Sequence, residues 1–292
     1  MKSIQGWINL YKPKNISSFQ AINEIKRKFS FNKIGHAGTL DPLAEGVLPI
    51  ALGKTTKLIS YINNSNKTYT CTVNWGSQTS TDDTEGEILL KSNKLPKINE
   101  ILSKLPNFIG KYKQTPPKVS AVKVRGQRAY KLARKNINFE ILPKEVEVSK
   151  LEVVSHEKFN TTFIINCGKG FYIRSFARDL GEKLETKAHI SSLKRIKVGK
   201  FEAKNANLLD DLLNIRQRLF EFKGFHSSSC MLDDILAYEI DDEKDITSIS
   251  QGKSIKLDIK KLIKAPLDLT DEKVIFLTVR KNIISFGKLS GD

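Results

Sequence analysis

The sequence predicts an α/β protein with a mixed, mostly antiparallel sheet and flanking helices over residues 1–225, followed by a small β-rich C-terminal domain over residues 230–292. Three observations support this prediction. Residues 67–75 alternate between apolar and polar side chains, which is typical of a half-buried antiparallel strand. Residues 17–29 repeat their apolar side chains at helical spacing. After residue 225, short apolar runs alternate with acidic turns, which favours a second small domain.

The N-terminal segment is expected to form a strand and then a helix. Residues 6–11 are mostly apolar and precede a loop marked by a proline, an asparagine and two serines. Ser17 and Gln20 have the spacing of a capping box, so the helix begins near Ser17. Its apolar positions recur at helical intervals and leave the basic residues 26–28 on the exposed face. These apolar positions are Phe19, Ile22, Ile25 and Phe29.

A loop built around one carboxylate follows this helix. Gly35 and Gly38 allow backbone angles that other residues avoid, and Pro42 disfavours helical geometry at Asp41. The apolar run 46–53 predicts a buried strand that anchors the loop in the core. Asp41 is therefore either a turn residue, which is common for aspartate before proline, or a functional carboxylate on a shaped loop.

The rest of the first domain is expected to combine strands and helices. Further helices are predicted at residues 54–61, 96–105 and 173–185, and further strands at residues 146–153, 163–167 and 188–201. Within the strand 67–75, Tyr69 shares the inward face and is by pattern a core tyrosine. Residues 76–86 contain Asp82 and Asp83. Because adjacent side chains diverge and no histidine is near, a solvated acidic loop is expected there and a cation site is not.

The composition limits which binding partners and which cellular compartment we expect. The 292 residues carry a formal net charge of +17, which favours a polyanionic partner such as nucleic acid, although a lysine-rich composition alone also produces an excess of this kind. The three cysteines, Cys71, Cys167 and Cys230, lack the spacing of a disulfide framework or a zinc site. No signal peptide or membrane-spanning run is recognisable, so we expect a cytoplasmic protein without a membrane partner.

Clustering of the positive charge supports the nucleic-acid interpretation. Residues 111–135 contain nine lysines and arginines and no acidic residue, and aromatic, proline and glycine residues lie between them. This composition indicates a folded or partly ordered basic element suited to a phosphate backbone. The candidate contacts to RNA phosphates are Lys123, Arg125, Arg128, Lys131 and Arg134.

Five ordered motifs between residues 6 and 200 are similar to those of a known enzyme family. They are KPxGxxS at 12–18, GHxGxLDPxAxGxLP at 35–49, KxY at 67–69, PPxxSAxKxxGxRAYxxAR at 116–134 and KGxYIR at 169–174. The chain resembles the bacterial tRNA pseudouridine synthases of the TruB type, which modify the T-loop uridine at position 55 of tRNA. Two positions depart from the pattern. Asn15 replaces a glycine, which is tolerable because asparagine also adopts left-handed geometry, and Val119 replaces an aromatic residue.

The resemblance implies a role for six residues. Asp41 would be the catalytic nucleophile, and Arg174 would pair with it and keep it ionised. His36 would take the place of the base that leaves the RNA stack. The residues implied to contact the target base are Tyr69, Tyr172 and Leu193. Without the resemblance, each of these side chains would be assigned to ordinary packing or to the surface.

The implied reaction is the isomerisation of uridine to pseudouridine, which needs no cofactor and no metal. Asp41 would attack ribose C1′ or uracil C6, or assist the departure of the base, after the target uridine has been flipped out at a cost of roughly a few kcal/mol. The partner would be the T-arm of tRNA and the enzyme a monomer, with a C-terminal domain that binds RNA as in related enzymes. Two rival functions remain: a non-catalytic tRNA-folding chaperone, and a metal-dependent nuclease that uses Asp41, Asp82 and Asp83.

Overall fold

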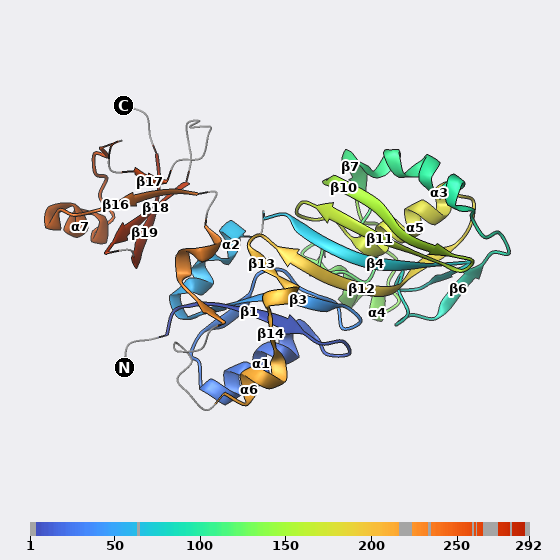
Figure 1. Cartoon of the computed structure of the whole chain (residues 1–292), viewed down its shortest axis with the longest axis horizontal. Helices are drawn as coiled ribbons and strands as arrows, with labels where there is room; N and C mark the ends of the chain where they lie inside the picture. Colours follow the sequence, from blue (N-terminus) through green and yellow to red (C-terminus); the bar gives the residue numbers. More distant parts are fainter. Residues whose placement is uncertain are drawn as a thin grey trace.

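The computed structural model describes residues 4–62, 65–215, 224–232, 235–258, 260, 262–264, 274–280 and 282–289. Within these residues, eleven strands form one large sheet and four strands form a second sheet near the C-terminus. Figure 1 shows helices packed along the large sheet, and the second sheet with α7 (Glu243–Ser250) at one end of the molecule. The predicted fold class, an α/β domain followed by a small β-rich domain, is confirmed.

The large sheet is mixed and mostly antiparallel. Its main path runs in the order β14-β1-β3-β12-β4-β11-β10-β7. The bounds along this path are β14 Asn207–Leu208, β1 Gly6–Lys12, β3 Glu45–Leu52, β12 Ala188–Val198, β4 Lys67–Trp75, β11 Asn160–Cys167, β10 Lys144–Glu157 and β7 Gly110–Gln114. Three short strands extend it, namely β2 Ile34–His36 on β3, β13 Phe201–Glu202 on β12 and β15 Phe225–His226 on β1. Two of the pairs along the path, β14–β1 and β3–β12, are parallel.

Strands β3 and β12 join the two halves of the large sheet, β14-β1-β3 and β12-β4-β11-β10-β7, through a very short stretch of paired residues. Its paired positions are Glu45 with Lys194 and Gly46 with Arg195. Gly46 has a φ of 108°, and a Cβ built there would lie 2.2 Å from the carbonyl oxygen of Arg195. The strands can approach this closely because the position has no side chain. Gly46 therefore allows the half of the sheet that contains β3 to lie close against the half that contains β12 and β4.

Helix α1 (Ser18–Phe29) begins where the capping box predicts. Ser17 is its N-cap, and the side chains of Ser17 and Gln20 cap each other's backbone N–H groups. The prediction that Phe19 belongs to the buried stripe is wrong, because its side chain is 70% exposed. The buried positions are Ser18, Ala21, Ile22 and Ile25. Phe19 lies outside this buried stripe, because the neighbouring Ser18 side chain points into the protein and forms hydrogen bonds with the loop that follows the helix.

The other helices and short strands complete the architecture. The remaining α-helices are α2 Ile59–Ile62, α3 Ile98–Lys104, α4 Ala129–Arg134, α5 Ile173–Lys183 and α6 Leu209–Leu213. A 3₁₀ helix, Gly53–Leu58, takes up most of the helix predicted at residues 54–61. Helix α5 packs on β12 and β4, and α1 packs beside α6, so the two groups of helices cover different halves of the sheet (Figure 1). No helix among the described residues is long and apolar enough to cross a membrane.

The segment that follows residue 224 is attached to the large sheet. Strand β15 pairs with β1, and the indole N–H of Trp7 donates to the carbonyl oxygen of Ser228 at 3.0 Å. Met231 and Leu232 pack in one apolar cluster with Trp7. The C-terminal sheet then follows in the order β17-β16-β18-β19, with bounds β17 Leu262–Lys264, β16 Leu236–Glu239, β18 Val274–Val279 and β19 Asn282–Lys288. The domain boundary near residue 225 stays a prediction.

The close approach at Gly46 predicts a strong destabilisation by Gly46→Ala. The new methyl group must displace the backbone of β12, and the left-handed φ adds strain, so we expect a loss of about 3 kcal/mol or more in the free energy of unfolding. Gly110→Ala is the matched control, because Gly110 also has a positive φ, 83°, but nothing lies within 4 Å of its Cβ position. Urea denaturation of both variants measures the difference. Equal losses would contradict the proposed backbone collision.

Candidate active site

Two hydrogen-bonded contacts hold the loop that carries Asp41. The hydroxyl of Ser18 donates to the carbonyl oxygen of Leu40 and accepts from the Leu40 N–H, both at 2.9 Å. The backbone N–H of Asn15 donates to the carbonyl oxygen of Pro42 at 2.8 Å. Asn15 has a φ of 66°, as expected for an asparagine that replaces glycine at a left-handed position. Both neighbours of Asp41 are thereby fixed to the segment that begins α1.

Lys12 supports the same loop from inside the protein. Its side chain is fully buried, and its ammonium donates to the carbonyl oxygens of Pro13 at 2.7 Å, Ile16 at 2.6 Å and Pro42 at 3.5 Å. Burial lowers the pKa of Lys12 to about 8, and the nearby carboxylate of Asp41 opposes this shift. Through these three hydrogen bonds, the Lys12 ammonium joins the loop at residues 13–16 to the loop that carries Asp41.

Asp41 forms an ion pair with Arg174, the second residue of α5. The guanidinium lies 2.9 Å from the Asp41 carboxylate, and it also donates to the carbonyl oxygens of Thr81 at 2.9 Å and Val119 at 3.1 Å. A second carboxylate, Asp83, lies 3.6 Å from the guanidinium Nε. The Arg174 side chain is 6% exposed, whereas that of Asp41 is 36% exposed. A buried, multiply bonded arginine thus presents a charge to a carboxylate that solvent or a ligand can reach.

The expectation of a solvated acidic loop at residues 76–86 is wrong. Asp82 and Asp83 are 6% and 1% exposed. Asp82 pairs with Arg178 at 3.2 Å. Asp83 lies beside Arg174, which is one helical turn before Arg178. Burial raises the pKa of Asp82, and the guanidinium of Arg178 opposes the shift. The two arginines of α5 make burial of these carboxylates possible, because a buried charge needs an opposite charge beside it. The segment also forms a hairpin of β5 (Ser77–Thr79) and β6 (Ile88–Lys91).

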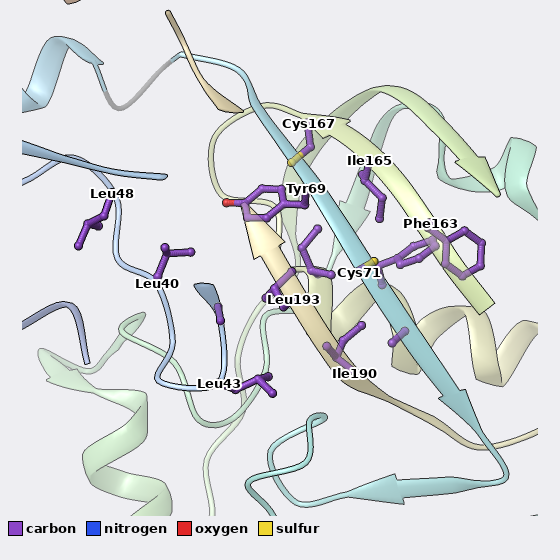
Figure 2. Close-up of a cluster of buried hydrophobic side chains, with 14 of the residues drawn as sticks. Leu40, Leu43, Leu48, Tyr69, Cys71, Phe163, Ile165, Cys167, Ile190 and Leu193 are labelled. Carbon is purple, nitrogen blue, oxygen red and sulfur yellow. The ribbon is translucent and has the colours of Figure 1, made fainter. Parts of the chain in front are cut away.

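An apolar and aromatic wall lies beside the Asp41 loop. Figure 2 shows Tyr69 and Leu193 on neighbouring strands, β4 and β12, on the face of the sheet where Leu40 and Leu48 also lie. Leu193 is buried opposite Cys71 of β4, and Tyr69 is buried as the alternation predicts. Burial raises the pKa of the Tyr69 hydroxyl, so the side chain is a neutral phenol. Its hydroxyl points from β4 toward the strand that carries Leu48 (Figure 2).

Tyr172 is held at its backbone by Gln114, the last residue of β7. The N–H of Tyr172 donates to the Gln114 side-chain oxygen at 2.9 Å, and the Gln114 amide donates to the Tyr172 carbonyl oxygen at 3.2 Å. Gln114 is buried, whereas the Tyr172 side chain is partly exposed. Burial raises the pKa of the Tyr172 hydroxyl, while the charge of Arg174 opposes the shift and that of Asp41 adds to it. Tyr172 therefore lies within the electrostatic reach of the Asp41–Arg174 pair.

His36 lies at the start of the Asp41 loop, at the end of β2. It pairs with Ile50 of β3, and its ring is partly buried. Its Nδ1 is buried and has no hydrogen-bond partner among the described residues. Burial lowers the pKa of His36, and the positive charge of Arg195 lowers it further. The imidazole is therefore neutral at neutral pH.

The basic residues gather on one projecting element. It consists of a small hairpin, β8 (Lys123–Val124) and β9 (Gln127–Arg128), followed by α4. Arg134 also lies over the ring of Tyr130, 5.8 Å from its centroid. The five predicted phosphate contacts are all exposed, and none takes part in the ion pairs of the described residues. They are Lys123, Arg125, Arg128, Lys131 and Arg134. This element begins four residues after Val119, whose carbonyl oxygen accepts a hydrogen bond from Arg174.

The structure thus brings four of the six predicted site residues to the Asp41 loop or to its ion pair, and Tyr69 and Leu193 into the adjacent wall. Sequence reasoning missed the roles of Asp83, Gln114 and Arg195. A signal for Asp83 was present, because Arg174 and Arg178 lie four residues apart on a predicted helix and would need acidic partners if buried. Nothing in the sequence distinguishes Gln114 or Arg195 from surface residues.

The geometry suits covalent chemistry by a carboxylate. Among the described residues, no group of three or more His, Cys, Asp or Glu side chains is arranged to hold a metal ion. The guanidinium of Arg174 occupies the space between Asp41 and Asp83. An arginine can pair with a carboxylate without removing it from solvent, and a carboxylate that a ligand can reach is suited to nucleophilic chemistry.

Comparison with known proteins identifies the family. A model described as TruB family pseudouridylate synthase (N terminal domain) matches residues 26–173, and one described as tRNA pseudouridylate synthase B C-terminal domain matches residues 174–242. The chain belongs to the TruB family. The TruB-family enzyme tRNA pseudouridine synthase B of Ehrlichia ruminantium (strain Gardel) is 42% identical over 264 residues, which cover 89% of this chain and 88% of that protein.

Two further comparisons extend over nearly the whole chain. The tRNA pseudouridine synthase B of Bartonella tribocorum (strain CIP 105476 / IBS 506) is 38% identical over 99% of this TruB-family chain and 93% of its own length. A chain in the solved structure described as "Crystal Structure of a Cbf5-Nop10-Gar1 Complex" superposes with a TM-score of 0.74. That superposition covers 97% of this chain and 78% of the other at 24% identity, and it shows that the two share a fold.

The Asp83–Arg174 contact predicts a loss of turnover in Asp83→Asn. The substitution keeps the shape but removes one of two carboxylates beside the guanidinium, so Arg174 holds Asp41 less precisely. We expect kcat for pseudouridine formation to fall by about 100-fold, because small misplacements of a catalytic group are costly, while the Kd for tRNA stays constant. Asp179→Asn is the control, since Asp179 pairs with Arg178 and not with Arg174. An unchanged kcat in Asp83→Asn would show that Asp83 does not support the pair.

Because the pKa of His36 is lowered in the folded protein, the free energy of unfolding should decrease at acidic pH. The unfolded chain binds a proton at His36 near pH 6.5 and the folded chain only at lower pH, so stability falls as the pH drops below 6.5. Urea denaturation at pH 7.5 and pH 5.5 should show that His36→Asn loses up to about 1.4 kcal/mol less than the wild type over this interval. Equal losses in the two proteins would mean that the imidazole is protonated as easily in the fold as outside it.

Proposed function

We propose that this chain converts the uridine at position 55 in the T-loop of tRNA to pseudouridine, with Asp41 as the nucleophile. The observation that carries the proposal is the Asp41–Arg174 ion pair, in which a partly exposed carboxylate on a fixed loop meets a buried guanidinium. The reaction breaks the bond between N1 and ribose C1′ and forms a bond between C5 and C1′. N1 gains a proton and C5 loses one to water, so no cofactor and no metal are required.

The target uridine must leave the RNA stack before Asp41 can reach it. Unstacking costs roughly a few kcal/mol, and a planar side chain that fills the gap recovers part of this cost. His36 has the required chemistry, because it lies five residues before Asp41 and its lowered pKa keeps the ring neutral. We assign to His36 the position of the flipped base.

The detached uracil needs walls that keep it in place while it rotates. Tyr69 and Leu193 supply an aromatic and an aliphatic surface on adjacent strands, and Tyr172 adds a second aromatic ring near Arg174. A pocket of this kind excludes water and holds a loose base without a covalent bond. We therefore assign these three side chains to the binding of the base.

The basic element supports binding of the T-arm. Its five exposed cations have no acidic partner in the described structure, so they can meet phosphates without first breaking ion pairs. We further propose that residues 230–292 form an accessory RNA-binding domain beside a catalytic domain that ends near residue 225. The proposal includes a cytoplasmic monomer, since one chain carries every group that the mechanism uses.

The decisive experiment follows tritium released from uridine C5 of a transcribed tRNA. Wild-type protein should release it in the presence of chelator and without any cofactor, and Asp41→Asn should release none while binding tRNA normally. Asp179→Asn is a matched control in which a carboxylate away from the Asp41 loop is removed. Release by both Asp41→Asn and wild type would refute the role of Asp41. No release by either, with binding intact, would favour a tRNA chaperone.

Phosphate contacts by the basic element predict a change in the salt dependence of binding. Each of Lys123→Ala and Lys131→Ala should lower the slope of log Kd against log salt by about 1, because one fewer counterion is released. Lys158→Ala, at the distant β10–β11 turn, should leave the slope unchanged. If all three variants keep the wild-type slope, the basic element does not contact the RNA backbone.

A further inference from the structure

Arg195 is a buried cation that the proposed mechanism does not use. It lies in the middle of β12, is 1% exposed, and is among the largest fully buried side chains of the described structure. None of the ion pairs among the described residues includes it, although a buried charge without a partner costs several kcal/mol. An aliphatic side chain of similar volume would avoid that cost. The guanidinium is therefore bound in another way.

Its partners are backbone carbonyl groups of the segment that carries Asp41. Nε donates to the carbonyl oxygen of Val47 at 2.7 Å, and one terminal nitrogen donates to that of Gly38 at 2.8 Å. The other terminal nitrogen lies 3.3 Å from the position of a Cβ on Gly38, whose φ is 93°. One rigid guanidinium thus spans the two ends of the loop, and it belongs to the residue that pairs with Gly46.

The same guanidinium faces Tyr69. Arg195 and Tyr69 are directly paired residues on β12 and β4. The positive charge of Arg195 opposes the rise that burial causes in the Tyr69 pKa. The loop that carries Asp41 and the side chain of Tyr69 therefore lie on either side of one residue of β12.

We propose that Arg195 is a positioning residue that fixes the Asp41 loop against the β4–β12 strand pair, which carries Tyr69. This inference rests on the proposed function, in which Asp41 and Tyr69 act on one base. Removal of Arg195 leaves Asp41, Arg174 and Tyr69 in the chain but frees the Gly38 carbonyl. The loop then samples positions in which the carboxylate and the base are misaligned.

The test compares Arg195→Met, Arg195→Lys and the control Lys197→Met. Lys197 lies on the same strand but is exposed and pairs with Glu202 at 3.2 Å. Hydrogen exchange by mass spectrometry follows peptides that cover residues 36–46, where Ala37, Leu40 and Ala44 have bonded N–H groups. Tritium release over multiple turnovers at saturating tRNA gives kcat, and a tRNA-binding assay gives Kd, for the same proteins.

Arg195→Met should speed exchange in residues 36–46 by about tenfold or more while the helix α5 peptides exchange as in the wild type. Its kcat should fall by about 100-fold, with a Kd for tRNA within about threefold of the wild type. Arg195→Lys keeps the charge but reaches fewer carbonyl oxygens, so it should show a smaller increase in loop exchange and a smaller fall in kcat. Lys197→Met should change neither the loop exchange nor kcat.

Unchanged exchange in the loop, or an equal increase throughout the protein, would overturn the proposal. An unchanged kcat in folded Arg195→Met would do the same. If Arg195→Met does not fold, the lysine variant decides by the same two readouts. If wild-type protein releases no tritium, the proposed function fails, whereas the exchange data still decide whether Arg195 holds the loop.

Discussion

The position of Asp41 depends on a guanidinium that other groups already hold. Arg174 is nearly buried and bonds two backbone carbonyl oxygens and a buried carboxylate, Asp83, in addition to Asp41. A buried arginine with a single partner would be unstable, because desolvation of the charge exceeds the energy of one contact. With Asp83 and the carbonyl groups in place, the guanidinium can stay at one position and offer its remaining edge to Asp41. Arg174 thereby pairs with Asp41 while the Asp41 carboxylate remains accessible.

The fold brings these groups together at the junction between two half-sheets. The loop of Asp41 leads into β3 on one side, and Tyr69, Leu193 and Arg195 come from β4 and β12 on the other. The parallel β3–β12 contact extends over two residue pairs, so its position depends on the backbone contact at Gly46. Asp41, the proposed nucleophile, and the walls of the proposed base pocket therefore belong to different halves of the sheet. Small displacements at the junction would change the distance between them.

Local pattern was sufficient to predict much of the fold. The alternation in residues 67–75 coincides with β4, and the capping box fixes the start of α1, because both signals depend on residues close in sequence. The burial of Asp82 and Asp83 could not be predicted in this way. Their partners lie about 95 residues later on α5, and only the folded chain brings these charges together. The exposure of Phe19 was missed for a similar reason, since Ser18 turns toward a loop that follows the helix.

The motifs identified Asp41, Arg174 and Tyr69, but not what holds them. Gln114 and Arg195 bind backbone atoms, and such contacts leave no recognisable pattern of side chains in the sequence. The role of Asn15 was predictable because left-handed geometry depends on the residue itself. Residues that carry chemistry were thus easier to find than residues that position them.

The central claim is that Arg174 is held independently of Asp41. A crystal structure of Asp41→Asn tests it most directly, since the substitution removes the charge that Arg174 meets in the site. The account predicts that the guanidinium stays on Asp83 and on the carbonyl oxygens of Thr81 and Val119. If the Arg174 side chain instead turns away from these three groups toward solvent, Asp41 holds the arginine in place, and the account is contradicted.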